Sequence, residues 1–160
     1  MKKLEFIIKP VGYVRHTDEG TYLELLDKYA AAVEELEGFS YINVLWWAHL
    51  TDEEDYRDIL ECEKPYKGAP DKVGIFATRS PARPNPILLT AVNIIRVAKE
   101  KIYVPYIDAE DGTPIIDIKP YHPATDRIKD VIVPEWCSHW PIWYEDSADF
   151  DWEAEFVHEK

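Results

Sequence analysis

The fold of this chain is decided by the stretch YINVLWWAHL, residues 41–50. The stretch is rich in β-branched and aromatic residues, which favour the pleated, half-buried surface of a sheet. It is bounded by Gly38 on one side and by an acidic segment from Thr51 on the other. Its length and its boundaries predict a buried strand. A strand this apolar needs partner strands and a packed layer.

Further strands are expected on both sides of this stretch. Alternating or β-branched runs predict strands at 4–14, 21–25, 73–78 and 115–121, and residues 89–108 predict a hairpin that turns near Lys99–Lys101. Residues 27–36 predict a helix that ends at Gly38. Short strands with close turns favour a mainly β fold, which we expect to be a small antiparallel β-barrel made of a single sheet with short peripheral helices.

Size and charge limit the function. The chain has 160 residues, of which 46% are apolar, so we expect one domain with a real core. We place the barrel domain at residues 1–144 and an acidic, aromatic C-terminal tail at 145–160. The formal charge is −13, and such a surface repels phosphate backbones at long range. A nucleic-acid site on this protein must therefore be a local basic patch or come partly from a partner.

The sequence gives no sign of secretion, membrane insertion or metal binding. No apolar run approaches the length of a membrane span or of a signal peptide. We therefore expect a cytoplasmic protein without membrane association, in which Cys62 and Cys137 are free thiols. The Cys137–His139 spacing matches no common zinc pattern, so no metal site is predicted.

The stretch RSPARPNP (79–86) places two arginines in a proline-rich loop that is expected to be rigid. Ser80, Arg83 and Asn85 each precede a proline and therefore avoid the α region, so the loop is extended before any ligand binds. A preorganised loop lowers the cost of holding Arg79 and Arg83, whose guanidinium groups bind carboxylates and phosphates. The loop predicts an anion clamp. The alternative is a structural loop whose arginines pair with surface acids.

A second polar group lies in DGTPIIDIKPY (111–121). Asp117 and Lys119 are two residues apart, so they share a face of a strand, and Tyr121 joins them if the strand continues past Pro120. A carboxylate, an ammonium and a phenol on one face can bind a polar ligand or exchange a proton. The alternative is an exposed strand face with one weak ion pair.

Three blocks of the sequence together resemble one known family. They are LEGFSYINVLWWAH (36–49), VGIFATRSPARPNPI (73–87) and DAEDGTPIIDIKPYHP (108–123). In this order and spacing they resemble the TrmO family, also called the TsaA-like or YaeB-like domain. The isolated glycines, which form no Rossmann or Walker loop, agree with that resemblance.

The resemblance implies a β-barrel that binds S-adenosylmethionine, forms homodimers and methylates N6 of threonylcarbamoyladenosine at position 37 of tRNA. Matching motif positions imply a cofactor site, an adjoining substrate site and two candidates for the reaction itself. For the cofactor these positions are His49, Arg79, Leu89, Asp108, Ala109, Glu110 and Asp111; for the substrate Arg83, Asn85 and Lys119; for catalysis Asp117 and Tyr121.

The sequence departs from the family pattern at two places. Leu88 replaces a family glycine after N-P-I, and the N-terminal segment lacks the family P-R-Q. With the acidic charge, these departures leave two alternatives to tRNA methylation. One is a methyltransferase of the same fold that acts on a small molecule or a protein, and the other is a domain that binds S-adenosylmethionine without catalysis.

Overall fold

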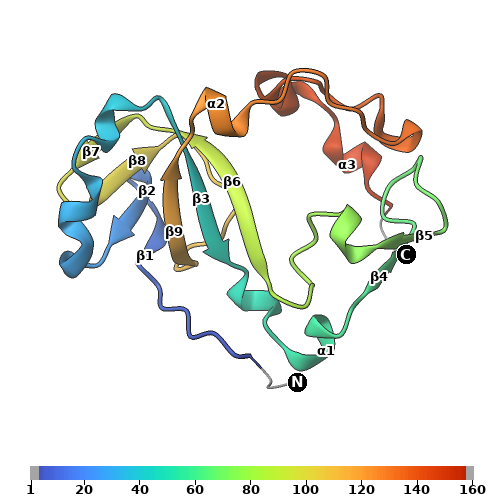
Figure 1. Cartoon of the computed structure of the whole chain (residues 1–160), viewed down its shortest axis with the longest axis horizontal. Helices are drawn as coiled ribbons and strands as arrows, with labels where there is room; N and C mark the ends of the chain where they lie inside the picture. The colour runs from blue at the N-terminus through green and yellow to red at the C-terminus, as the bar shows by residue number, and fades with distance from the viewer. Residues whose placement is uncertain (1–3, 158–160) are drawn as a thin grey trace.

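A seven-stranded antiparallel sheet forms the larger part of the molecule (Figure 1). The computed structural model describes residues 4–157. The strands follow the order β6-β3-β9-β1-β2-β8-β7. Their bounds are β1 Gly12–Thr17, β2 Gly20–Leu25, β3 Tyr41–Trp47, β6 Ile87–Asn93, β7 Arg96–Ala98, β8 Lys101–Val104 and β9 Pro114–Pro120.

Strand β3 is buried on one face, as its sequence predicts, and it lies second from the β6 edge of the sheet. It pairs with β6 along its whole length and with β9 on its other side. Ile42, Val44 and Trp46 are buried while their neighbours are half-buried, so one face of β3 forms the core. The core is contributed by six strands and two adjoining segments: Val14, Leu23, Leu25, Ile42, Val44, Trp46, Ala48, Val92, Ile102, Val104, Ile107 and Ile115.

The predicted mainly β, antiparallel class is confirmed, and the expected hairpin turns at Lys99–Glu100. The strand expected at 4–14 is wrong for most of its length, because residues 4–11 form no strand and β1 runs from Gly12 to Thr17. Pro10 in this segment has no N–H to donate to a ladder. Closure into a barrel stays a prediction. The hydrogen-bonded order begins at β6 and ends at β7, and residues 4–157 contain no ladder between these two strands. They are nevertheless consecutive in the chain, joined by Ile94 and Ile95.

The helices are shorter than the sequence predicts. The expected helix at 27–36 consists of two 3-10 turns, η1 Asp27–Val33 and η2 Leu36–Gly38, separated at Glu35, which has a positive φ of 65°. The expected strand at 73–78 ends at Gly74 and continues as a 3-10 turn, η4 Ile75–Ala77. The α-helices have four residues each: α1 Glu54–Arg57, α2 Pro123–Asp126 and α3 Trp152–Glu155. None of the helices within residues 4–157 has the length and apolar character needed to cross a bilayer.

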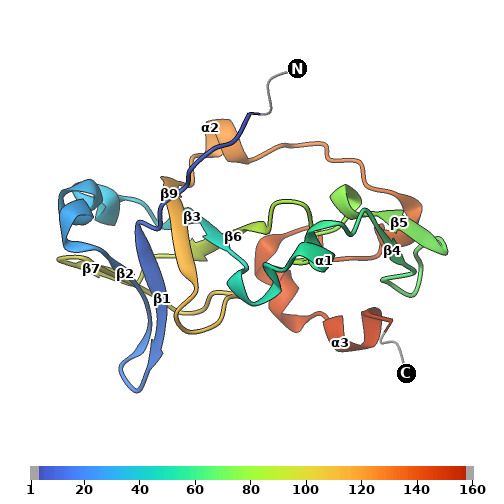
Figure 2. The same cartoon turned by 90° about the horizontal axis from the view of Figure 1, so that it is seen from below.

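A second lobe lies beside the sheet (Figure 2). It combines the hairpin of β4 Glu61–Glu63 and β5 Lys72–Gly74 with the C-terminal segment, which includes η5 Glu135–Cys137, η6 Tyr144–Asp149 and α3. Tyr66 is central to it, because its ring contacts aromatic rings before and after residue 144. The ring centroids lie 5.5 Å from Trp136, 4.8 Å from Trp140 and 5.5 Å from Phe156.

The two parts of the second lobe come very close at Gly68. A Cβ at this position would lie 2.6 Å from the carbonyl oxygen of Trp136, which is closer than real Cβ atoms approach. Glycine therefore lets the β4–β5 loop pack on the C-terminal segment. Trp140 also contacts Trp152 at 5.3 Å, across the domain boundary expected at residue 144, and that boundary stays a prediction.

Glu155 places a carboxylate inside the second lobe, where it is 7% exposed. It accepts hydrogen bonds from the Trp140 indole at 3.0 Å and from His139 Nε2 at 3.1 Å. The indole hydrogen bond, followed by that of His139, holds the pKa of Glu155 below its ordinary value. The ionised carboxylate is thus the form that the folded lobe stabilises.

This carboxylate predicts a loss of stability in acid. A group whose pKa is lower in the folded state stabilises the protein above its unfolded pKa, about 4.3 for glutamate, and that contribution is lost as the pH falls through the folded value. We expect Glu155→Gln to be less stable than the natural protein at pH 7 but to lose less stability between pH 5 and 3. Thermal unfolding across that range measures both; parallel pH profiles would contradict the assignment.

Candidate functional site

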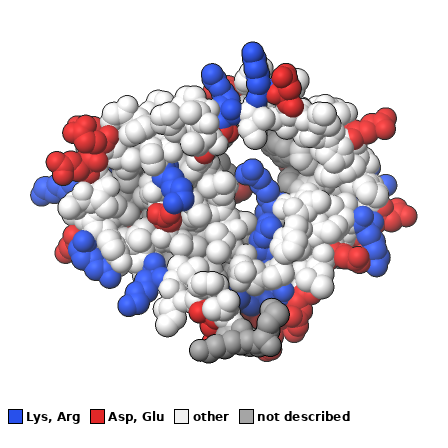
Figure 3. Space-filling model, in the orientation of Figure 1, with Lys and Arg blue, Asp and Glu red and all other residues white. Residues whose placement is uncertain are grey.

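One cavity, which we call the larger cavity, lies between the edge strand β6, the proline-rich loop and Tyr144. Its volume is about 690 Å³. Figure 3 shows an opening between the sheet and the second lobe, with Lys and Arg side chains beside it. The residues that line this cavity include five predicted from the sequence: Arg79, Arg83, Leu89, Asp108 and Tyr121.

The proline-rich loop is held in place by the segment that follows β3. Arg57 of α1 donates to the carbonyl of Pro84 at 3.2 Å and pairs with Asp52 at 2.6 Å. The Thr51 hydroxyl donates to the carbonyl of Pro81 at 3.2 Å. The Arg57 hydrogen bond lowers the pKa of Asp52, so this brace is ionised at neutral pH. The stiffness predicted from the prolines is therefore reinforced from outside the loop.

The two arginines of the loop have different environments. Arg83 donates to the carbonyls of Thr78 at 3.2 Å and Ser80 at 3.4 Å, and its guanidinium lies 5.9 Å from the Phe76 ring. Arg79 is exposed, and within residues 4–157 it has neither an ion pair nor a hydrogen bond. Arg83 thus shapes the loop, whereas Arg79 presents a guanidinium that is available to an anion.

Two carboxylates face the same cavity. Asp108 comes from the turn after β8, as the sequence predicts, and Asp126 comes from α2. Asp126 accepts from the Asn43 amide at 2.8 Å and from the His122 backbone at 2.7 Å. The His122 hydrogen bond is the largest cause that holds the pKa of Asp126 below its ordinary value. The cavity is therefore lined by cationic, anionic and apolar side chains.

Two tyrosines complete the wall of the cavity. The Tyr121 ring lies 6.4 Å from that of Tyr41, and its backbone amide donates to the Tyr41 carbonyl. Tyr144 packs edge-on against the same ring at 5.9 Å and donates its hydroxyl to the carbonyl of Ala91 at 2.7 Å. Burial raises the pKa of Tyr144, which keeps this phenol protonated. Tyr144 thereby ties the C-terminal segment to the edge strand β6.

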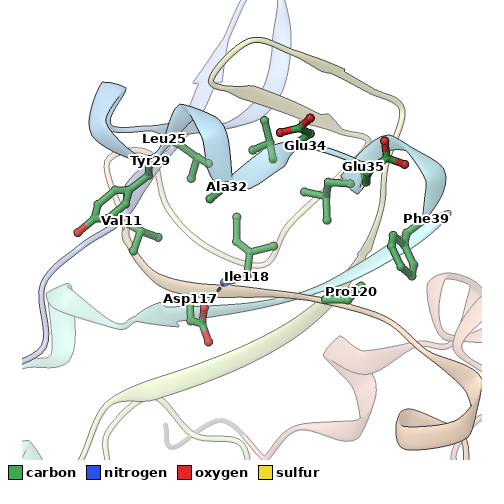
Figure 4. Close-up of a pocket in the computed structure, with 12 residues that line it drawn as sticks. Val11, Leu25, Tyr29, Ala32, Glu34, Glu35, Phe39, Asp117, Ile118 and Pro120 are labelled. Carbon is green, nitrogen blue, oxygen red and sulfur yellow. Dashed lines mark hydrogen bonds between the residues drawn. The ribbon is translucent and has the colours of Figure 1, made fainter.

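Asp117 and Lys119 share a face of β9, as the sequence predicts, but neither lines this cavity. Their side chains form an ion pair at 2.7 Å. Asp117 instead lines a smaller cavity of about 300 Å³ between β9 and the η1–η2 segment, where Figure 4 shows it beside Ile118. The register aligns Asp117, Leu45 and Leu89 in one row, so two strand spacings, about 10 Å, separate Asp117 from Leu89.

The other predicted site residues do not line either cavity. His49 is exposed at the start of η3 His49–Thr51, and Asn85 is exposed in the loop. The turn that carries Ala109, Glu110 and Asp111 is fastened to β1. His16 donates its backbone amide to Asp111 at 2.8 Å, and its Nε2 lies 2.7 Å from the Ala109 carbonyl. Because a carbonyl only accepts, Nε2 is the donor in this hydrogen bond.

Several lining residues were not singled out in the sequence. Trp46 and Thr90, whose side chains share a 3.0 Å hydrogen bond, lie on β3 and β6. The side chains of Asn43 and Asp126, which are 83 positions apart in the sequence, share a hydrogen bond. The only local signal for Asp126 is its place after His122-Pro123, which favours a helix start. Within residues 4–157 no group of three potential metal ligands occurs.

Comparison with known proteins places the chain in a family. Residues 10–127 match the family described as the tRNA-methyltransferase O N-terminal domain. The chain belongs to this family. The resemblance of its three sequence blocks to the TrmO family is therefore confirmed.

Two relatives show what proteins of this family are named for. A probable S-adenosyl-L-methionine-binding protein of Methanocaldococcus jannaschii is 38% identical over 121 residues, which cover 76% of this chain and 96% of the relative. The tRNA (adenine(37)-N6)-methyltransferase of Escherichia coli is 38% identical over 123 residues. Those residues cover 74% of this chain but only 52% of the Escherichia coli protein.

A solved structure shares the fold. The crystal structure of TrmO from Pseudomonas aeruginosa superimposes with a TM-score of 0.65 at 26% sequence identity. The match covers 84% of this chain and 62% of that one. This chain thus spans less than two thirds of the solved TrmO chain.

Proposed function

We propose that this protein is a methyltransferase that uses S-adenosylmethionine, and that its acceptor is N6 of threonylcarbamoyladenosine at position 37 of tRNA. One observation carries the proposal. The two motif blocks, which are separate in sequence, supply Arg79, Arg83, Asp108 and Tyr121 to one cavity of a TrmO-family fold. The names of the relatives support the cofactor and N6 of an adenine at position 37 of tRNA. The threonylcarbamoyl group on that adenine is part of the proposal.

The residues of the larger cavity fit the cofactor. S-adenosylmethionine supplies a methyl group on a sulfonium that is already activated for transfer. Arg79 would hold the carboxylate of the methionine part of the cofactor, because a guanidinium group can donate two parallel hydrogen bonds to a carboxylate. Asp108 and Asp126 would face its positive groups. Leu89, whose side chain is exposed, offers an apolar surface for the adenine ring.

Because the methyl group is already activated, the site must mainly align the acceptor nitrogen with that methyl group and exclude water. The reaction needs no nucleophile from the protein. Tyr121 is better placed than Asp117 to contact the acceptor, because it lines the larger cavity. Arg83, Asn85 and Lys119 stay candidates for the substrate side. At the rim, Phe76 is 79% exposed, Tyr144 55% and Leu89 46%. We propose that a second subunit of a cytoplasmic homodimer covers this apolar rim and excludes water.

The test is to follow the methylated nucleoside. A strain that lacks this protein is expected to lose the N6-methyl form of threonylcarbamoyladenosine from its tRNA, as seen by mass spectrometry of digested nucleosides. Re-expression of the natural chain restores the modification. Unchanged levels of the methylated nucleoside in the deletion strain would reject tRNA as the acceptor.

A second candidate is methylation of a small molecule or a protein by the same site, favoured by the charge of −13. Tight tRNA binding with a steep salt dependence would count against it. A third is cofactor binding without catalysis, favoured by Leu88, which lines the cavity where the family has glycine. Formation of S-adenosylhomocysteine with any acceptor would exclude the third.

Tyr121→Phe is expected to lower kcat about fivefold and to change the affinity for S-adenosylmethionine less than twofold. The reason is that a hydrogen bond of about 1 kcal/mol to the acceptor is lost while the ring contacts remain. Asp117→Asn is the matched comparison and should change kcat less. Steady-state kinetics and calorimetry measure the two effects. A larger kcat loss for Asp117→Asn would assign the reaction to the β9 ion pair instead.

A further inference from the structure

The outer face of strands β1, β2, β8 and β7 carries basic side chains and tyrosines on an acidic protein, and one of these tyrosines, Tyr22, is buried. Core residues such as Val14, Leu23 and Ile102 point to the opposite side of these strands. The pairing register places Arg15, Tyr22, Tyr103 and Arg96 side by side in one row across the four strands. The adjacent row consists of Tyr13, Glu24, Lys101 and Ala98. We call these two rows the outer sheet face.

Each cation of the outer sheet face lies over a tyrosine ring of the same face. The Arg96 guanidinium lies 3.4 Å from the centroid of the Tyr103 ring, and the Lys101 ammonium lies 4.5 Å from that of Tyr22. Arg15 lies 5.5 Å from the Tyr13 ring. The Tyr22 and Tyr103 rings contact each other at 5.3 Å. These contacts restrict the long side chains, so less ordering is required when an anion binds.

The charge of this face contrasts with the rest of the protein. It has three cations and a single carboxylate, Glu24, which pairs with Arg15 at 2.8 Å. Within residues 4–157 neither Lys101 nor Arg96 has a carboxylate at ion-pair distance. In a chain of formal charge −13, two unpaired cations mounted on aromatic rings form the local basic patch that a polyanion needs.

The outer sheet face also reaches the candidate active site. Arg15 is followed in β1 by His16, which holds the turn at Asp111 and Ala109. Asp108 of the same turn lines the larger cavity. The turn that His16 holds thus connects β1 to one wall of the larger cavity.

We propose that the outer sheet face docks the tRNA, and that Arg96 and Lys101 contact its phosphates. The proposal rests on the proposed function, because it takes tRNA as the substrate. Aromatic and basic side chains on a sheet are suited to RNA with unstacked bases, such as a loop, because cations neutralise the phosphates while planar groups stack on bases. An acidic protein segment would use the cations but would have no need of stacking.

The experiment measures binding of the full chain to tRNA that carries threonylcarbamoyladenosine, over a series of salt concentrations. The double variant Arg96→Gln with Lys101→Gln is expected to bind about tenfold more weakly at 0.1 M salt and to reduce the slope of log K against log salt by about 2, one for each phosphate contact. Its affinity for S-adenosylmethionine is expected to match that of the natural chain.

The matched control is Lys28→Gln with Lys72→Gln, which removes the same charge elsewhere. Lys28 also lies over a tyrosine ring, Tyr29, at 4.7 Å, and Lys72 lies on β5 in the second lobe. The control substitutions should reduce the slope of log K against log salt much less than Arg96→Gln with Lys101→Gln does. Equal losses in variant and control would overturn the proposal, as would a natural chain that does not bind tRNA.

The outcomes separate the two proposals. If the double variant loses tRNA affinity as expected but the natural chain transfers no methyl group to tRNA, the docking face stands and the proposed function fails. If the natural chain methylates tRNA and the double variant does so with unchanged KM, the function stands and the docking face fails. Thermal unfolding of each variant identifies any loss of affinity that comes from misfolding.

Discussion

Arg79→Ala is expected to weaken binding of S-adenosylmethionine by about 10- to 100-fold, because a hydrogen bond to a charged group is worth roughly 1.5–3 kcal/mol. Arg79 lines the larger cavity and, within residues 4–157, has no protein partner. The Arg79 guanidinium can therefore bind a ligand, and its removal should not weaken the fold. Isothermal titration calorimetry measures the affinity, and the melting temperature should stay within about 2 °C, as for surface substitutions away from structural contacts.

The control for Arg79 is Arg79→Lys, which keeps the charge but removes the planar fork. We expect it to recover part of the affinity. Arg83→Ala tests the division of roles, because Arg83 is bonded to the Thr78 and Ser80 carbonyls. Its main effect should be a faster hydrogen exchange in residues 78–86. Unchanged affinity in Arg79→Ala would remove this residue from the cofactor site.

Tyr66→Ala is expected to have the largest effect on stability. The Tyr66 ring contacts Trp136, Trp140 and Phe156, and loss of a large aromatic side chain from such a cluster costs about 3 kcal/mol. For a chain of this size the melting temperature should fall by roughly 6–12 °C. Tyr144 belongs to the same C-terminal segment as this cluster and contacts β6 through its hydrogen bond to Ala91. If the cluster is loosened, the wall that Tyr144 forms is loosened too, so the affinity for S-adenosylmethionine should fall as well.

Tyr66→Phe separates the ring from the hydroxyl. Burial raises the pKa of Tyr66, so the hydroxyl is neutral and the ring provides the contacts. The phenylalanine variant should therefore melt within about 2 °C of the natural chain, as expected when a substitution creates no cavity. If Tyr66→Ala kept its melting temperature, the aromatic cluster would not be part of the cooperative fold.

Much of the sheet can be predicted from the sequence, because its signals are local. YINVLWWAHL, the Lys99–Glu100 turn and the strand after Gly112 each combine periodicity with turn residues. The errors arose where tertiary contacts override local preference. Residues 75–77 look like a strand, but they turn as η4 to feed the proline-rich loop, which Thr51 and Arg57 hold.

The candidate site could be predicted only in part. The two motif blocks bring Arg79, Arg83, Asp108 and Tyr121 to one cavity, and the roles expected for these residues stay predictions. Asp126 and Tyr144 join the cavity through long-range contacts, to Asn43 and to Ala91, for which the sequence has no periodic signal.

The contact at Gly68 offers a criterion for sorting related chains. Any side chain there would collide with the Trp136 carbonyl and push the two halves of the second lobe apart. We expect descendants of one ancestor that retain this closed lobe to keep glycine together with aromatic residues at 66 and 136. In relatives without this glycine, we expect the β4–β5 loop and the C-terminal segment to pack against each other in a different way.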